Sequence, residues 1–333
     1  MNTKKQVLSC VQPTGNLHFG RYLGAVRSWV ELQKEYHCLY GVVNYHAMTM
    51  PFKKNELIPS TWEVVFNLIA CGIEPKNIFI QSLIPEHAEL AWIFNCMCSY
   101  GELSRMTQFK EKSQLVREDS RDAFISSGLF TYPILQAADI LIYKTHYVPV
   151  GKDQEQHLEL TRSIAQRFNF VADKEYFVLP ETLFSETPRI MSTADPTRKM
   201  SASLGEKHNI DIFSSPDQIR KKIKSAVTDS GAGGNIMSPG VENLFTLLKA
   251  SGSDESYQQL LLKYRNHDLS YGALKVAVAE AIIELTAPIR DKKDKILADK
   301  KSYESMVRES SSEIRKKARQ TLSEVKDLVG LVK

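Results

Sequence analysis

The sequence predicts an α/β fold with a parallel sheet, followed by an all-helical region. In the first half, short apolar runs alternate with longer segments of helical periodicity, the order that builds parallel sheets. After Ser214 only helical periodicity continues. A chain of 333 residues is long enough for two domains. We therefore expect one domain over residues 1–213 and a second, helical domain over residues 214–333.

The apolar runs of the first half are expected to be strands of one sheet. They cover residues 6–11, 38–43, 77–81 and 147–150, with 176–179 as a last short extended segment. Between them, apolar residues recur at helical spacing, as in the crossovers that connect parallel strands. The expected helices cover residues 20–35, 56–70, 86–100, 102–114, 132–143 and 154–168.

The helical region carries two long stripes of apolar residues. One contains Leu274, Ala277, Val278, Ala281, Ile282 and Leu285, and the other contains Val307, Ile314, Ala318, Leu322, Val325 and Val329. Spacings of three and four residues place each set on one face of a helix. Pro288 lies between the stripes, and we expect it to kink or divide the helical stretch. The last helices are candidates for packing back on the first domain.

Composition indicates a soluble globular protein of the cytoplasm. The chain is 43% hydrophobic and 25% charged, and it lacks an apolar run near the roughly 20 residues that a membrane helix needs. The N-terminus does not resemble a secretory signal. Its five cysteines are odd in number and scattered, which favours reduced structural thiols over disulfides or a bound metal.

The C-terminal tail is basic. Residues 291–333 contain 12 Lys or Arg and 8 Asp or Glu, a net charge of 12 − 8 = +4. A basic helix of this kind could contact a nucleic-acid backbone. A solvated helical surface of mixed charge is the alternative, and for the tail alone we favour it.

Two segments far apart in the chain have the composition of phosphate-binding elements. Residues 13–20 (PTGNLHFG) form a turn between a predicted strand and a helix, where unpaired N–H groups attract anions. Here His18 can donate a hydrogen bond, and Gly20 allows a flat base to approach. Residues 199–203 (KMSAS) form a flexible-looking loop. Alone, the first could be a capped turn and the second a surface loop, but together they predict a nucleoside triphosphate held from two sides.

This pair of segments resembles the ATP motifs of class I aminoacyl-tRNA synthetases, His-Ile-Gly-His and Lys-Met-Ser-Lys-Ser. Here they read HFGR from His18 to Arg21 and KMSAS from Lys199 to Ser203. Two positions depart from the pattern, because Arg21 replaces the second His and Ala202 replaces the second Lys. The remaining cations must then supply more of the positive charge, so we expect Lys199 to be hard to replace.

Further segments are similar to the tryptophanyl-tRNA synthetases in particular. They are residues 101–112 (GELSRMTQFKEK), 136–141 (QAADIL), 148–162 (VPVGKDQEQHLELTR) and 189–197 (RIMSTADPT). The resemblance implies a Rossmann-like catalytic domain, a helical tRNA (anticodon)-binding domain and a homodimer. It implies that ATP and L-tryptophan form tryptophanyl-adenylate, and that the tryptophanyl group then passes to tRNA(Trp). Mg²⁺ would bridge the phosphates, without a tightly bound protein metal.

The resemblance also implies which residues bind ATP. Catalysis would rest on positioning and charge stabilisation, with His18, Lys112, Lys199 and Ser201 as the catalytic residues. Lys112 would reach the pyrophosphate group, although it could be one more exposed charge. The residues expected to contact ATP itself are Gln12, Pro13, Thr14, Gly20 and Arg21 around the turn, Gly151, Lys152 and Asp153 at the ribose, Ile190 at the adenine, and Lys199, Met200, Ser201, Ala202 and Ser203 over the phosphates.

Asp139 is the residue expected to select the amino acid. A buried carboxylate can accept the indole N–H, and it rejects phenylalanine because it would be left unpaired. Its neighbours are apolar, which favours burial over a helix-capping role. Tyr132 and Gln154 would receive the ammonium group. The remaining expected residues of the pocket are Gln136, Val43 and His46, the last of which could equally be a satisfied core histidine.

Three alternative functions remain open at this point. Tyr132, Gln136 and Asp139 also form a pattern that in tyrosyl-tRNA synthetases binds tyrosine, and Gln136 favours that family. An adenylyl- or cytidylyltransferase shares the His-x-Gly-His turn but is usually smaller. A catalytically silent paralogue is the third alternative, favoured by Ala202 alone. The segments at 105–112 and 151–162 favour tryptophan.

Overall fold

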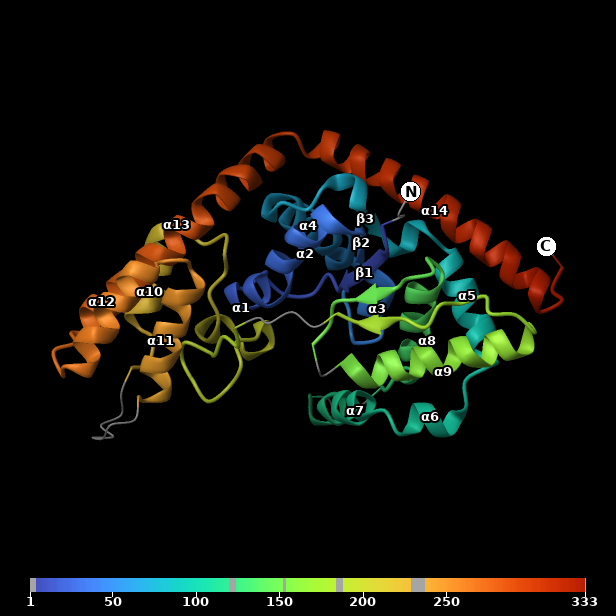
Figure 1. Cartoon of the computed structure of the whole chain (residues 1–333), viewed down its shortest axis with the longest axis horizontal. Coiled ribbons are helices and arrows are strands. Elements are labelled where there is room, and N and C mark those ends of the chain that lie inside the picture. Colours follow the sequence, from blue (N-terminus) through green and yellow to red (C-terminus); the bar gives the residue numbers. More distant parts are fainter. Residues whose placement is uncertain (1–3, 120–123, 152–153, 184–187, 229–236, 333) are drawn as a thin grey trace.

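The computed structural model describes residues 4–119, 124–151, 154–183, 188–228 and 237–332. Figure 1 shows a central sheet between two layers of helices, with a group of helices at one end and two long helices that pass over the top. No described helix is long and apolar enough to cross a membrane.

The sheet has five parallel strands in the order β3-β2-β1-β4-β5. The strands are β1 (Gln6–Val11), β2 (His37–Val42), β3 (Ile78–Ile80), β4 (Tyr147–Val148) and β5 (Glu181–Thr182). Each of the first three pairs with its neighbour, and β4 then joins the free side of β1. The chain therefore adds β2 and β3 on one side of β1 and then returns to add β4 and β5 on the other side. The strand order reverses between β1 and β4. Ligands of open α/β sheets bind beyond the carboxyl ends of the strands at such a point.

Helices cover both faces of the sheet, because neighbouring residues on each strand point to opposite sides. Val7 belongs to one cluster of buried side chains and Leu8 to the other. The helices are α1 (Phe19–Arg21), a π-helical turn (Tyr22–Val26), α2 (Arg27–Glu35), α3 (Asn44–Ala47), α4 (Lys54–Cys71), α5 (Glu86–Asn95), α6 (Tyr100–Ser104), α7 (Thr107–Asp119), α8 (Ser127–Leu141), α9 (Glu155–Val171), α10 (Pro216–Lys224), α11 (Pro239–Ala250), α12 (Asp254–Arg265), α13 (Tyr271–Ala298) and α14 (Lys300–Leu328).

The last strand differs from its prediction. It forms at Glu181–Thr182 and not at residues 176–179. The backbone N–H groups of Tyr176 and Phe177 instead donate to the Oδ1 atom of Asn169, at 3.1 and 2.8 Å, and both rings are buried in the core. These residues anchor the end of α9, and the chain can pair with β4 only after them.

Helix boundaries also differ from the predictions in several places, and α8 begins at Ser127, before its expected start at residue 132. The expected helix over 86–100 ends at Asn95, and a capping box of Ser99 and Glu102 begins α6 instead. The helix expected over 102–114 is split between α6 and α7, where the side chain of Gln156 bonds the carbonyl of Arg105 and the N–H of Thr107. Pro288 lies inside α13 and does not divide it. Its ring is exposed, so water can solvate the carbonyl group that loses its partner. The division falls at Asp299, between α13 and α14.

The C-terminal helix α14 packs along β3 and α5 (Figure 1). The Nε atoms of Arg315 and Arg319 lie 2.8 and 3.1 Å from Oε1 of Glu86, a buried residue at the start of α5. Lys326 of α14 pairs with Glu89, which also lies on α5. Part of the basic tail is therefore bound to α5. The expectation of a solvated charged surface is wrong for Arg315 and Lys326, which are half-buried, but Arg319 is 62% exposed and fits it.

Candidate active site

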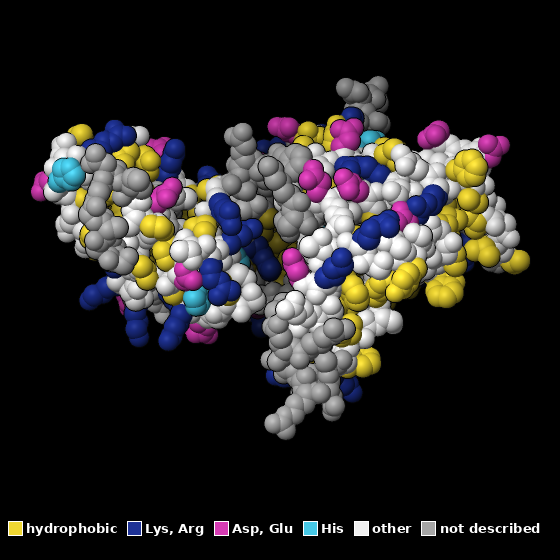
Figure 2. Space-filling view, turned by 90° about the horizontal axis from the view of Figure 1, so that it is seen from below, with side chains coloured by type: hydrophobic (Ala, Val, Ile, Leu, Met, Phe, Trp, Pro, Cys, Tyr) yellow, Lys and Arg dark blue, Asp and Glu magenta, His cyan; other side chains and the backbone are white. Residues whose placement is uncertain are grey.

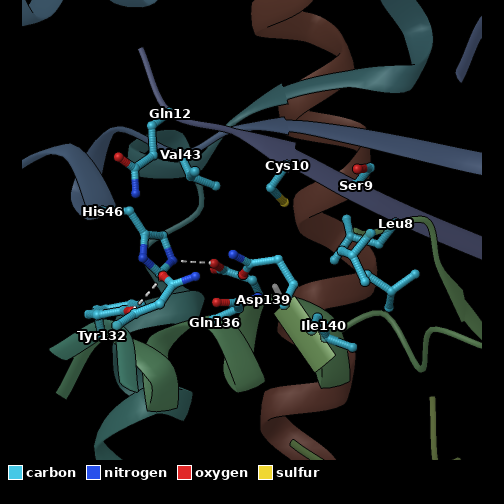
Figure 3. Close-up of a pocket in the computed structure, with 14 residues that line it drawn as sticks. Leu8, Ser9, Cys10, Gln12, Val43, His46, Tyr132, Gln136, Asp139 and Ile140 are labelled. Carbon is cyan, nitrogen blue, oxygen red and sulfur yellow. Dashed lines mark hydrogen bonds and ion pairs between the residues drawn. The ribbon is translucent and has the colours of Figure 1, made fainter. Parts of the chain in front are cut away.

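A pocket of about 310 Å³ opens between the carboxyl ends of β1 and β4, at the reversal of the sheet (Figure 3). Residues of β1, α3, α8 and the segment after β4 line it. The volume is in the range of small-molecule sites. All six residues predicted for amino-acid binding lie on its wall, namely Val43, His46, Tyr132, Gln136, Asp139 and Gln154. Gln12, from the predicted ATP set, lies there too.

Asp139 is the buried acid at the base of this pocket, with 2% of its surface exposed. Nε2 of His46 lies 2.7 Å from Oδ2, and Nδ1 of His87 lies 2.6 Å from Oδ1. The amide nitrogen of Gln81 donates to both oxygens, at 2.8 and 3.0 Å. Burial by itself raises the pKa of Asp139, but hydrogen bonds and the charges of the two histidines lower it to about 2. The carboxylate is ionised, and a helix-capping role is excluded.

Two of these partners, Gln81 and His87, were not predicted from the sequence. Gln81 directly follows β3, so a polar residue at the carboxyl end of an apolar strand was the available signal. His87 lies in the first turn of α5, and no local pattern indicates that it faces a helix 52 residues away. Other wall residues missed by the prediction are Leu8, Ser9, Cys10, Gln108, Ile140, Val148 and Val150.

Tyr132 closes another side of the pocket. Its hydroxyl donates to Oε1 of Gln108 at 3.2 Å and lies 2.9 Å from Nε2 of His157. Burial raises the pKa of Tyr132 to about 12, so the hydroxyl stays neutral. Its ring meets that of His46 edge to face. His46 is thus both a pocket residue and a hydrogen-bonded buried histidine.

His18 begins the helix of the first phosphate-binding segment. Its Nδ1 accepts a hydrogen bond from the backbone N–H of Arg21 at 3.2 Å, so the ring proton lies on Nε2. Burial, with smaller contributions from the charges of Arg21 and Lys199, lowers its pKa to about 4. At neutral pH the residue is an uncharged hydrogen-bond donor.

The loop at Lys199 is docked in this structure. Lys199 pairs with Met191 as an antiparallel bridge, and the N–H of Met200 donates to the carbonyl of Ile190 at 3.0 Å. Both Met200 and Ile190 are 2% exposed, so they are core residues in this arrangement. Lys199 itself is exposed.

The two phosphate-binding segments touch one another through glycines. Gly15 has φ of +67°, and a Cβ atom added there would lie 2.8 Å from Cβ of Ala202. A Cβ on Gly20 would lie 3.3 Å from Cβ of Met200 and from Nδ1 of His18. Glycine at both positions is therefore explained by the close approach of the loop, and Ala202 lies at the contact.

Several predicted ATP-site residues are placed differently or fall outside the described part of the chain. Pro13 is buried, Thr14 is exposed, and Oγ of Ser201 lies 2.8 Å from Oγ of Ser203. Gly151 is exposed and accepts from the N–H of Gln154 at 3.0 Å. Lys152, Asp153 and the side chain of Lys112 lie outside the described residues. In the described part, no group of three His, Cys, Asp or Glu side chains could hold a metal ion.

Comparison with known proteins gives consistent results across the chain. Residues 1–287 match the family model of class I tRNA synthetases for W and Y. A tryptophan–tRNA ligase of Wolinella succinogenes is 44% identical over 99% of both chains, and one of Helicobacter pylori is 42% identical with the same coverage. The tryptophanyl-tRNA synthetase of Campylobacter jejuni, solved with ADP and tryptophan, superposes with a TM-score of 0.85 at 32% identity, over 98% of this chain and 100% of that one.

Proposed function

The chain belongs to the class I tRNA synthetases of tryptophan and tyrosine, and we propose that it is the tryptophan–tRNA ligase of this family. It uses ATP to activate L-tryptophan as tryptophanyl-adenylate and transfers the tryptophanyl group to tRNA(Trp). The observation that carries this assignment is the buried, ionised Asp139 in a pocket at the sheet reversal, in a chain whose full-length relatives are tryptophan–tRNA ligases. Tyrosine activation has only Gln136 in its favour.

In the first step, a carboxylate oxygen of tryptophan attacks the α-phosphorus of ATP. A new O–P bond forms, the bond to the bridging oxygen of the β-phosphate breaks, and pyrophosphate leaves with that electron pair. The attacking carboxylate is already ionised, so no general base is needed. The site must instead bring the two reactants together and stabilise negative charge on the phosphates.

We assign this charge stabilisation to the segments around His18 and Lys199. Nε2 of His18 can donate a hydrogen bond to a phosphate oxygen without adding a charge. Arg21 and Lys199 both lower the pKa of His18, so their positive charges reach the same region. Ser201 and Ser203 add donors on the loop, and Gly151, Lys152 and Asp153 are assigned to the ribose. Lys112 is assigned to the departing pyrophosphate, and Mg²⁺ bound with ATP would add positive charge at the phosphates.

We assign amino-acid selection to Asp139. The indole N–H of tryptophan would donate to its carboxylate, and an amino acid without a donor at that place would gain no such hydrogen bond. Tyr132 and Gln154 line the same pocket and are assigned to the ammonium group. In the second step, a terminal hydroxyl of the tRNA attacks the activated carbonyl and AMP leaves.

The second substrate and the assembly complete the proposal. We assign tRNA binding to the helical region, residues 214–333, and we expect a homodimer in the cytoplasm. Figure 2 shows hydrophobic side chains gathered toward the end of the molecule formed by α5, α6 and α9. Trp92, Tyr100 and Phe170, on these helices, are 71, 77 and 87% exposed. Exposed aromatic residues of this kind are typical of interfaces. Light scattering on the purified protein should therefore give twice the mass of one chain.

The test of the function is ATP–pyrophosphate exchange with single amino acids. Labelled pyrophosphate should enter ATP only when tryptophan is present with Mg²⁺. Exchange with tyrosine in its place would overturn the tryptophan assignment. Absence of exchange with any amino acid would indicate a silent paralogue.

A further inference from the structure

Asp139 has its hydrogen-bonding capacity filled before any amino acid enters the pocket. An ionised carboxylate offers about four lone-pair positions. The structure uses four contacts from three donors, with His87 and Gln81 on Oδ1 and His46 and Gln81 on Oδ2. A fourth donor, such as an indole N–H, therefore has to take the place of one that is already there. Which donor leaves depends on how firmly each is held.

His87 is held from behind. Its Nδ1 donates to Asp139, because an ionised carboxylate can only accept, and its Nε2 lies 2.7 Å from the hydroxyl of Tyr143. The His87 ring is stacked on Phe79 at 5.6 Å, and neither His87 nor Tyr143 has any exposed surface. Tyr143, His87 and Asp139 thus form one buried chain of hydrogen bonds, in which the hydroxyl fixes the orientation of the imidazole.

Gln81 is held in the same way from another side. Its Oε1 accepts the backbone N–H of Tyr45 at 3.0 Å, which fixes the direction of the amide group that faces Asp139. The segment that carries both residues is also clamped by α14. The hydroxyl of Ser311 accepts the N–H of Ile80 at 3.2 Å, and Arg315 pairs with Glu86. Neither Gln81 nor His87 can leave without disturbing this framework.

His46 is the donor on the pocket side. It lines the pocket itself, on the four-residue helix α3, whereas Gln81 and His87 are absent from the pocket wall (Figure 3). Its ring is held by Asp139 through one hydrogen bond and by an edge contact with Tyr132. Rotation of this side chain would expose Oδ2 to the pocket and would leave the two rear donors in place.

We propose that His87 is a positioning residue that, oriented by Tyr143, holds Asp139 from behind, and that His46 is an exchangeable partner whose place on Oδ2 the indole N–H takes. The proposal rests on the proposed function, because it assumes that tryptophan is the amino acid in this pocket. It implies that binding exchanges one hydrogen bond for another. The empty site keeps its buried carboxylate paired, and the N–H contributes less to affinity than it would against a bare carboxylate.

The test compares tryptophan with L-3-(1-benzothiophen-3-yl)alanine, in which sulfur replaces the indole N–H. The measured quantity is the ratio of kcat/KM for tryptophan to that for the analogue in pyrophosphate exchange. In the native protein Oδ2 keeps two donors with either ligand, Gln81 together with the N–H or with His46. His46→Ala removes the second option, so the ratio should rise about tenfold. Losses of packing at residue 46 affect both amino acids and cancel in the ratio.

A second variant tests the rear support. Tyr143→Phe removes only the hydroxyl on His87, and it should raise the KM for tryptophan severalfold and lower the ratio, with the KM for ATP unchanged. Tyr40→Phe is the matched control, because the hydroxyl of Tyr40 is also buried but donates to the carbonyl of Trp29 at 2.6 Å. It should cost stability without changing the ratio.

The outcomes separate the exchange from the function itself. A ratio that stays constant in His46→Ala, or a Tyr143→Phe variant that behaves like Tyr40→Phe, overturns the proposal while tryptophan activation stands. A native protein that does not activate tryptophan overturns the proposed function and the exchange with it.

Discussion

The amino-acid pocket and the phosphate side of the site are built in different ways. Around Asp139, buried side chains from α3, α5, α8 and the turn after β3 form a hydrogen-bond network that is complete without a ligand. Around His18 and Lys199, backbone segments approach through glycine, and the cation Lys199 remains exposed. The difference follows from what each side does. Selecting an aromatic ring needs fixed, desolvated groups. The phosphates, by contrast, change charge during the reaction and pyrophosphate leaves, and exposed cations on a docked loop can move with these groups.

The largest expected effect comes from removing the carboxylate of the amino-acid pocket. Asp139→Ala should lower kcat/KM for tryptophan by about a thousandfold, because the indole N–H loses its acceptor and the buried donors of His87 and Gln81 lose theirs. The KM for ATP should change less than about threefold. Exchange kinetics at varied tryptophan and varied ATP separate the two. Equal losses on both sides would show that Asp139 is structural, and Asp139→Asn, of nearly the same shape, controls for packing.

On the phosphate side, Lys199→Ala should have the largest effect. The motif has Ala202 where a second lysine is common, so Lys199 is the one lysine within residues 199–203. We expect kcat for exchange to fall about a hundredfold, as when one electrostatic group of a catalytic site is removed. Binding of tryptophan alone should be unchanged. The converse variant Ala202→Lys tests whether the missing charge matters. A loss of less than threefold in Lys199→Ala would contradict the assignment.

The contact between the two phosphate segments gives a smaller effect. Gly15→Ala places a side chain at φ of +67° and 2.8 Å from Ala202, so the loop must shift. The KM for ATP should rise about tenfold, with tryptophan affinity unaffected. Gly252→Ala is the control, because its φ is +84° and nothing lies within 4 Å of the added atom. If both variants behave alike, backbone strain and not the loop contact is responsible.

The clamp of α14 on α5 should influence the amino-acid pocket only indirectly. Arg315→Ala removes the Nε group that donates to both carboxylate oxygens of Glu86, next to His87, and leaves Arg319 as the second partner. We expect the KM for tryptophan to rise about threefold and the KM for ATP to stay constant. Lys316→Ala, which loses an exposed pair with Glu313, should have no effect. An equal change in the two Michaelis constants would argue against transmission through α5.

The protonation of His18 can be tested through the pH dependence of folding stability, with no activity measurement. Its pKa of about 4 lies below that of an ordinary histidine, because burial and nearby cations disfavour the charged ring. Between pH 6.5 and 4 the unfolded chain therefore binds a proton at this residue that the folded protein does not. Stability should fall as the pH falls through this window, and less so in His18→Gln. An NMR titration of His18 with a midpoint near 6.5 would contradict the assignment.

The sequence predicted the strands and the pocket more completely than the supports of the pocket. Period-two and helical patterns are local, so β1 and the crossover helices follow from short windows of sequence. The residues around Asp139 were identified through family resemblance, and the structure brings all six to one wall. His87, Gln81 and the pairing of Arg315 with Glu86 join segments tens to hundreds of residues apart, and no local pattern carries that information. The shift of the last strand has the same cause, since Asn169 holds Tyr176 away from the sheet.

The most direct measurement is calorimetric titration of L-tryptophan, without ATP, into the native protein, Lys199→Ala and Asp139→Asn. If the two sides of the site are separate devices, Lys199→Ala binds tryptophan within about twofold of the native affinity. Asp139→Asn binds at least about thirtyfold more weakly, since a charge-assisted hydrogen bond is lost. Equal affinities in the two variants would contradict the division between an amino-acid pocket that selects and a phosphate side that reacts.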